Sequence, residues 1–249
     1  MRVVSWNCNG ALRNKLEAID SLEADVLIIQ ECEDPTHSSP AFREWAGRYL
    51  WVGDSKHKGI GIFPRHGHTL RRMDWCSSFR MPGLEGNSAA LSWKTQDLKL
   101  FQPFKLDDGP VFVAAWTKGN PQQAFRYIGQ LWKYIQIHRQ DIRQHQAFII
   151  GDLNSNVTWD RPDQWWNHSD VVSELEAIGL TSLYHHQSGE AQGAESRPTF
   201  FLQRNQRKPY HIDYIFGPRA QLETYFLEIG SPTDYWLKFS DHLPLILST

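Results

Sequence analysis

Five short runs of carboxylate, amide and imidazole residues have the composition of a catalytic centre, and each lies at the margin of an apolar run typical of a buried strand. Carboxylates at such positions are costly unless they are paired, hydrogen-bonded or bound to a metal ion. Residues that flank five different strands can meet at one edge of the sheets. The runs are Asn7-Cys8-Asn9-Gly10, Gln30-Glu31, Gly151-Asp152-Leu153-Asn154, His211 to Phe216 around Asp213, and Ser240-Asp241-His242.

Each run taken singly has a simpler interpretation as a strand-end turn or a helix cap. Asn9, for example, is well placed to cap a helix that begins near Leu12. Glu31 alone does not decide between the two readings. Five such coincidences beside five core strands favour a shared site.

Length and composition indicate one globular domain covering residues 1–249. The hydrophobic fraction is 41%, which allows a sizeable core, and the net charge is −2. A dedicated nucleic-acid binder is often strongly basic, so the overall charge gives no support to non-specific polyanion binding. It does not exclude a nuclease, because a catalytic metal ion brings its own positive charge.

The cysteines and the apolar runs bear on the compartment. Cys8, Cys32 and Cys76 are too few and too scattered for a disulfide framework. No apolar run approaches the roughly 20 residues of a membrane span. Residues 2–6 read as a first strand rather than as a leader. We therefore expect a cytoplasmic protein.

The coarse pattern alternates many short strands with a few amphipathic helices. Continuous apolar runs predict strands buried on both faces at 26–29 and 147–150. Helical spacing predicts helices over 12–22, from just after Pro121 to about 135, and from about 169 to 178. This pattern suggests sheets stacked between helical layers. Further strands are predicted at 3–6, 59–63, 89–93, 98–104, 111–116, 199–202, 212–216 and 243–247.

The five motifs, in this order and at this spacing, resemble the endonuclease/exonuclease/phosphatase superfamily. Its members include exonuclease III-like abasic-site endonucleases, deoxyribonuclease I, deadenylases, inositol-polyphosphate 5-phosphatases and neutral sphingomyelinases. Gly151 to Asn154 and Ser240 to Pro244 are the most specific parts, and the resemblance runs from Ser5 to Leu245. It implies an α/β fold: a four-layer α/β/β/α sandwich of two packed, mostly antiparallel sheets, with the site at one end of the sheets.

The resemblance and the residue chemistry imply the same metal site. Glu31 is expected to bind the ion, with Asn7 as a second oxygen ligand or a phosphate contact. Asp241 either completes the shell or holds a second ion. Hard oxygen ligands without cysteine or clustered histidine favour Mg²⁺ or Mn²⁺ over zinc.

The resemblance also implies roles in proton transfer. Asp152 is expected to orient and deprotonate the attacking water, and Asn154 to position that water or the phosphate. His242 is expected to pair with Asp213 as an imidazolium that neutralises charge on the phosphoryl oxygens. No covalent enzyme intermediate is expected, because nothing resembles an activated nucleophile.

One departure from the family pattern lies at the end of the central strand, where several relatives carry a phosphate-contacting His or Tyr. Here the position is held by Trp116, whose indole can only donate a hydrogen bond. Thr117 or Lys118 is the candidate to supply the contact instead. Asn9 is a further substrate-binding candidate.

Two other features have both a functional and a structural interpretation. Trp159, Trp165 and Trp166 either stack on bases or pack a long loop onto the body, and the sequence does not choose between these. Arg204 and Arg207 lie in an expected hairpin loop, either on a solvated face or against a phosphate backbone.

The sequence therefore predicts a divalent-metal-dependent phosphodiesterase, with a nucleic-acid substrate (DNA or RNA) preferred. An alternative is a hydrolase of a small phosphorylated molecule or a lipid headgroup, which the near-neutral charge fits equally well. An inactive phosphate-binding module is disfavoured, because the costly carboxylates are all present.

Overall fold

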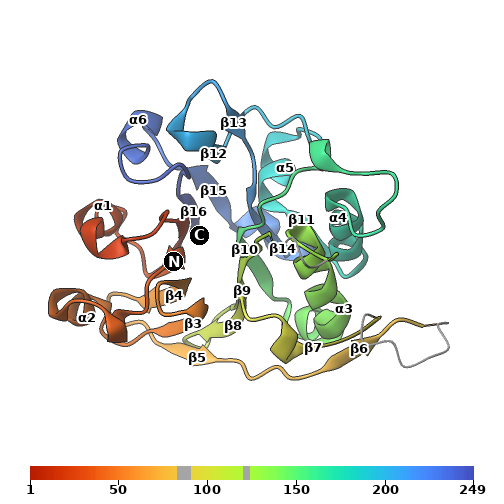
Figure 1. The fold of residues 1–249 in the computed structure, drawn as a ribbon, viewed down its shortest axis with the longest axis horizontal. Coiled ribbons are helices and arrows are strands. Elements are labelled where there is room, and N and C mark those ends of the chain that lie inside the picture. The colour runs from red at the N-terminus through yellow and green to blue at the C-terminus, as the bar shows by residue number, and fades with distance from the viewer. Residues whose placement is uncertain (83–90, 120–123) are drawn as a thin grey trace.

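Two six-stranded sheets form the centre of the computed structural model, which describes residues 1–82, 91–119 and 124–249 (Figure 1). The strand order of the first sheet is β15 (Phe226–Ile229), β16 (Leu245–Ser248), β1 (Arg2–Asn7), β2 (Val26–Cys32), β4 (Lys58–Pro64) and β3 (Leu50–Ser55). The order of the second is β11 (Leu180–Ser182), β14 (Asp213–Pro218), β10 (Phe148–Asp152), β9 (Val111–Trp116), β8 (Phe101–Leu106) and β5 (Leu70–Arg72).

Both sheets are mostly antiparallel, as predicted. Each contains one parallel pair, β1 with β2 and β9 with β10. The remaining neighbours in each sheet run antiparallel. Two short ribbons lie outside the sheets, β6 (Ser78–Arg80) with β7 (Ser92–Lys94) and β12 (Phe200–Phe201) with β13 (Pro209–Tyr210).

Helices cover the outer face of each sheet and complete four layers. α1 (Leu16–Asp20) and α2 (Pro40–Ala46) lie on one side of the molecule, and α3 (Ile128–His145) and α4 (His168–Ala177) lie on the opposite side (Figure 1). One hydrophobic cluster joins α1 and α2 to the first sheet and to the inner face of the second. A second cluster joins α3 and α4 to the outer face of the second sheet. The predicted α/β/β/α sandwich is therefore confirmed. α5 (Leu183–Ser188) and α6 (Thr233–Trp236) are short helices in the connections.

The predicted helices differ from the observed ones at their beginnings. The helix expected over residues 12–22 is split into a 3-10 turn at Leu12–Asn14 and α1, because Lys15 has a non-helical backbone. α3 begins only at Ile128, because Tyr127 has a φ of 52°. Pro121, the expected start, lies outside the described residues, as do residues 89 and 90 of the strand predicted at 89–93, whose last two residues belong to β7. Among the described helices, none has both the length and the apolar character needed to cross a membrane.

The strand that carries Asp152 passes very close to its parallel neighbour. A Cβ added at Gly151 would lie 1.9 Å from the main-chain oxygen of Ala115, and Gly151 has a φ of +147°. Only glycine fits here, because both the backbone angle and the space exclude a side chain. The close approach fixes the position of the residue that follows it, Asp152.

We therefore expect Gly151→Ala to destabilise the fold strongly. The matched control is Gly179→Ala, since Gly179 also has a positive φ (+87°) but meets nothing within 4 Å of an added Cβ. The Gly151 variant should lose about 1–3 kcal/mol more unfolding free energy than the control, in proportion to the overpacking. Urea denaturation of both variants measures this, and equal losses would contradict the close approach.

Candidate active site

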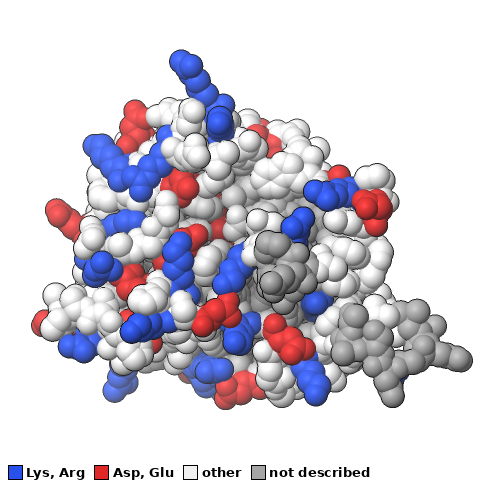
Figure 2. Space-filling view, viewed as in Figure 1, with Lys and Arg blue, Asp and Glu red and all other residues white. Residues whose placement is uncertain are grey.

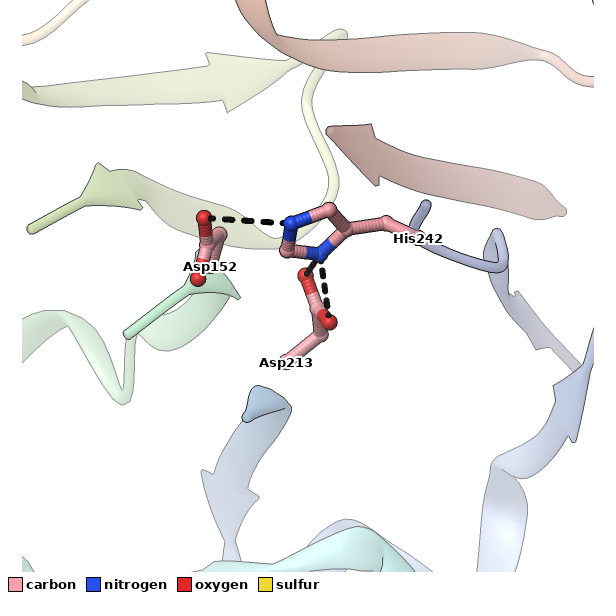
Figure 3. Close-up of side chains that lie close together, drawn as sticks. All are labelled: Asp152, Asp213 and His242. Atoms are coloured by element: carbon pink, nitrogen blue, oxygen red, sulfur yellow. Dashed lines mark hydrogen bonds and ion pairs between the residues drawn. The ribbon is translucent and has the colours of Figure 1, made fainter. Parts of the chain in front are cut away.

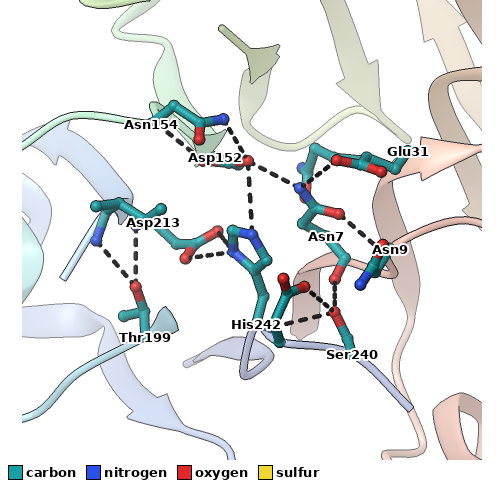
Figure 4. A network of polar contacts seen from close by, with 12 residues as sticks. Asn7, Asn9, Glu31, Asp152, Asn154, Thr199, Asp213, Ser240 and His242 are labelled. Carbon is teal, nitrogen blue, oxygen red and sulfur yellow. Dashed lines mark hydrogen bonds and ion pairs between the residues drawn. The ribbon is translucent and has the colours of Figure 1, made fainter. Parts of the chain in front are cut away.

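The polar side chains singled out in the sequence meet at one end of the two sheets. Asn7 and Asp152 are the last residues of β1 and β10, Asp213 is the first residue of β14, and Glu31 lies near the end of β2. β1 and β2 are parallel, so their carboxyl ends share an edge. Figure 4 shows that these side chains point toward one another together with His242.

Asn7 joins the two sheets through its side-chain amide. Its Nδ2 donates to Oδ2 of Asp152 at 2.8 Å and lies 3.4 Å from Oε1 of Glu31. Asp152 also accepts from the main-chain nitrogen and from Nδ2 of Asn154, both at 2.8 Å. The carboxylate is fully buried but has three hydrogen-bond donors, which offset part of the cost of its burial.

His242 lies between two carboxylates (Figure 3). Its Nδ1 is 3.0 and 3.1 Å from the two carboxylate oxygens of Asp213, and its Nε2 is 4.0 Å from Oδ2 of Asp152. The expected pairing of His242 with Asp213 is thus present in the structure. The ring is 5% exposed, so bulk water screens these charges little.

The two carboxylates hold a proton on His242. Burial alone would lower the pKa of His242, but the charges of Asp213 and Asp152 outweigh it and raise the pKa to about 9. Burial raises the pKa of Asp152 to about 7, although the charge of His242 lowers it. At neutral pH the imidazole is therefore a cation, with its charge directed toward Asp152.

Two hydroxyls position this group, and neither was predicted as a site residue, although Ser240 belongs to the Ser240-Asp241-His242 run. Oγ1 of Thr199 accepts from the main-chain nitrogens of Ile212 and Asp213, at 3.0 and 3.1 Å. Oγ of Ser240 donates to the main-chain oxygen of Asn7 at 2.7 Å and accepts from the nitrogen of His242 at 3.1 Å. Both residues are fully buried, so each fixes backbone rather than contacting solvent.

Glu31 occupies a strained position at a bulge in β2. It has a φ of 56°, and the register with β4 shifts between Gln30 and Cys32. Such bulges re-aim a side chain out of the strand pattern. Oε2 of Glu31 forms an ion pair with Nζ of Lys58, the first residue of β4. Lys58 was not predicted as a site residue, because its one local signal is a cation next to Gly59, which begins a predicted strand.

Asn9 and Asp241 lie beside this group. The main-chain nitrogen of Asn9 donates to Oδ1 of Asn7 at 3.0 Å, and the turn at Leu12 has Ala11 as its N-cap with no side-chain cap. The alternative role of Asn9 as a helix cap is therefore wrong. Asp241 is half-buried, and its Oδ1 lies 3.5 Å from Oγ of Ser240.

Residues 116–118, which stand where relatives carry a His or Tyr, offer few polar groups that are free to contact a substrate. Trp116 is buried, and the buried hydroxyl of Thr117 donates to the main-chain oxygen of Leu153. Lys118 lies over the Trp116 ring at 5.4 Å and pairs with Asp54. Of the three candidates, Lys118 alone presents a partly exposed charge.

Arg204 and Arg207, the two arginines of the β12–β13 hairpin, differ in their side-chain contacts. Arg204 donates to the main-chain oxygens of Lys238 and Phe239 at 3.1 and 3.2 Å, so it ties the loop to the segment before His242. Arg207 is exposed, and its side chain has no polar partner within the described part of the chain. Figure 2 shows lysine and arginine side chains spread over much of the face in view, with acidic groups between them.

Asp152, Asp213 and His242 also form the one group of three acidic or imidazole side chains, among described residues, that are close enough to share a metal ion, with ligand atoms within 4.8 Å. A protonated histidine cannot ligate a metal, and here both ring nitrogens face carboxylates. Glu31 offers a carboxylate whose cation partner, Lys58, is half-exposed and replaceable. Its oxygen chemistry fits Mg²⁺ or Mn²⁺ better than the imidazole group does.

Comparison with known proteins places this geometry in a family. The model of the Endonuclease/Exonuclease/phosphatase family matches residues 4–242, and the chain therefore belongs to that family. Its members are phosphoester hydrolases, and the nucleases among them depend on divalent metal ions. A search of the curated proteins found no match.

Solved structures share the fold. A 3'-5' exonuclease (NExo) from Neisseria meningitidis has a TM-score of 0.68 at 18% identity, with 100% of this chain and 99% of that chain covered. An AP endonuclease from Archaeoglobus fulgidus has a TM-score of 0.65 at 17% identity, with 100% and 98% covered. A 3' phosphatase NExo variant from Neisseria, bound to a product DNA hairpin, has a TM-score of 0.68 at 18% identity, with 100% and 98% covered.

The charge state of His242 gives a direct test of the site. In metal-free protein, Asp213→Asn should lower the pKa of His242 by at least about one pH unit, because the nearest opposite charge is removed. Asp241→Asn is the control, since Asp241 contributes least of the groups that raise this pKa. Nuclear magnetic resonance titration of the imidazole measures both values. Equal shifts in the two variants would contradict the geometry.

Proposed function

We propose that residues 1–249 act as a single catalytic domain that hydrolyses phosphodiester bonds of DNA or RNA with Mg²⁺ or Mn²⁺. The observation that carries the proposal is the placement of Asp152, which is held by Asn7 and Asn154 on one side and faces the Asp213–His242 pair on the other. Family membership supports a phosphoester hydrolase, and the DNA named with one neighbouring structure supports nucleic acid as the substrate.

Asp152 is suited to take a proton from water. Its carboxylate has a pKa near neutrality, where a general base is most effective. Asn154 orients the carboxylate through two hydrogen bonds and is half-exposed, so it can also contact the water or the phosphate. The water loses its proton to Asp152 as its oxygen attacks phosphorus, and the bond to the leaving oxygen breaks.

His242 supplies positive charge where negative charge accumulates. The imidazolium is fixed by Asp213, and Thr199 fixes the backbone of Asp213 in turn. A preorganised cation in a buried site stabilises developing charge more than one in water does. His242 therefore neutralises the phosphoryl oxygens without moving.

Glu31 is the residue we propose to hold the divalent ion, with Asn7 and Asp241 as further oxygen donors. A bound ion supplies Lewis-acid polarisation of the phosphoryl group. Among the described residues, Oδ1 of Asn7 accepts a single hydrogen bond, from the main-chain N–H of Asn9, which leaves an amide lone pair for a cation.

A small phosphoester is the second candidate substrate, and the net charge of −2 is the observation that favours it. Nucleic-acid binders gain affinity from an excess of cations, which this chain lacks overall. Lys58 and Lys118, the partly exposed cations beside the site, favour nucleic acid instead.

Asp152→Asn should lower kcat by about 10²–10⁴-fold, the usual contribution of a general base. Asp108→Asn, at a fully exposed carboxylate remote from the site, is the matched control and should leave kcat unchanged. The assay is hydrolysis of a panel of plasmid, abasic duplex, single-stranded RNA, poly(A) and inositol phosphates with Mg²⁺, Mn²⁺ or EDTA. Activity that survives both EDTA and Asp152→Asn would disprove the mechanism, and activity confined to inositol phosphates would disprove the nuclease assignment.

Lys58→Met should tighten divalent-metal binding by at least about threefold, because the ion no longer competes with an ammonium for Glu31. Lys118→Met is the control, since Lys118 pairs with Asp54 and not with Glu31. Calorimetric titration with Mn²⁺ in the absence of substrate gives both constants. Unchanged affinity in Lys58→Met would show that the ion does not bind at Glu31.

A further inference from the structure

A pocket of about 350 Å³ opens directly beside the catalytic group, between residues 124–128 and 154–168. Asn154, which holds Asp152 through two hydrogen bonds, is part of its lining. The volume lies within the range of small-molecule sites, so the pocket can take one nucleoside. No residue of the proposed chemistry other than Asn154 lines it.

The aromatic wall of this pocket contains one indole that is not used for packing. Trp159 is 47% exposed, and among the described residues its ring contacts Tyr210 alone, at 5.3 Å between tilted rings. Trp165 and Trp166, by contrast, pack with Phe125 at 5.4 and 4.3 Å. The structure therefore separates the three tryptophans: Trp165 and Trp166 pack the loop onto the body, and Trp159 presents a free face. Tyr127, 43% exposed, is a second exposed ring of the lining.

The pocket is also positively charged. Arg126 and Arg161 line it, and neither guanidinium has a polar partner within the described residues. The acidic group of the lining, Asp160, accepts from the main-chain nitrogens of His168 and Ser169 at 2.8 and 3.1 Å. Its charge is thereby directed to the start of α4, which leaves the two arginines uncompensated.

An exposed indole, two free guanidinium groups and a shared wall with the catalytic site are the recognition chemistry of a nucleotide. We propose that this pocket binds one unpaired nucleoside next to the scissile phosphate, with its base stacked on Trp159 and the flanking phosphates on Arg126 and Arg161. This proposal rests on the proposed nuclease function and names the form of its substrate. A base inside a duplex is already stacked on both faces, so the pocket selects single-stranded or unpaired ends.

Direct binding in EDTA separates this proposal from catalysis. The probe is a fluorescent single-stranded trinucleotide, followed by anisotropy with the full chain. Trp159→Ala should weaken binding about tenfold, the effect of losing one base–aromatic stack, and Trp159→Phe should restore most of it. Phe226→Ala is the matched control, because Phe226 is 61% exposed but lies on β15, outside the pocket.

The salt dependence of trinucleotide binding tests the two arginines of the pocket. Arg126→Ala and Arg161→Ala should each reduce the salt dependence of binding by about one counterion. A blunt duplex of the same length should bind the parent chain more weakly than the single strand, and Trp159→Ala should not change duplex binding.

The outcomes distinguish the two proposals. Two results would overturn the pocket proposal. One is equal affinity of the Trp159→Ala and Phe226→Ala variants for the trinucleotide. The other is an equal loss of affinity for duplex and single strand in Trp159→Ala. Trinucleotide binding that depends on Trp159 in a chain that hydrolyses no nucleic acid would uphold the pocket and overturn the proposed function. A parent chain that hydrolyses nucleic acid but does not bind the trinucleotide would overturn the pocket proposal and leave the proposed function standing.

Discussion

The hydrogen bond between Asn7 and Asp152 is the contact on which the rest of the site depends, because it joins the ends of the two sheets. Asp152 is fully buried and carries a charge that only fixed donors can stabilise. Those donors come from both sheets, Asn7 from β1 and Asn154 from the chain after β10. The imidazolium of His242, in the segment before β16, adds an opposite charge 4.0 Å away. The ionised state of Asp152 therefore depends on how the two sheets pack, since a shift of either sheet would leave a buried charge unpaired.

The site has two parts, a buried group that transfers and holds protons and a carboxylate that is available to a metal ion. Asp152, His242 and Asp213 form a buried row in which the imidazolium lies between two carboxylates. Glu31 lies at the edge of the row, on a strained bulge, with an exchangeable ammonium as its partner. The difference in exposure explains the division. A buried imidazolium flanked by two anions keeps its proton, whereas the partly exposed carboxylate of Glu31 can exchange a lysine for a metal ion.

The local sequence patterns predicted the parts of the molecule that depend on neighbouring residues. The continuous apolar runs located β2 and β10, and the polar residues after them located Glu31, Asp152 and Asn154. Contacts between distant residues carried no such signal: Ser240 bonds to Asn7 across 233 positions, and Lys58 reaches Glu31 across 27. The beginning of α3 was misplaced because it depends on the backbone of Tyr127, which no helical periodicity reports. The choice between stacking and packing for three tryptophans required their ring contacts, which only the fold supplies.

The position of the bound ion shows most directly whether Glu31 is the metal ligand and His242 the proton-bearing cation. Crystals grown with Mn²⁺ and measured at the manganese absorption edge locate the ion by its anomalous signal, without reference to activity. We expect the strongest peak at coordination distance from the carboxylate of Glu31, with His242 still bonded to Asp213. A peak held by Asp152, Asp213 and Nδ1 of His242 would contradict it, because the imidazole would then be a ligand and not the proton-bearing cation of the site.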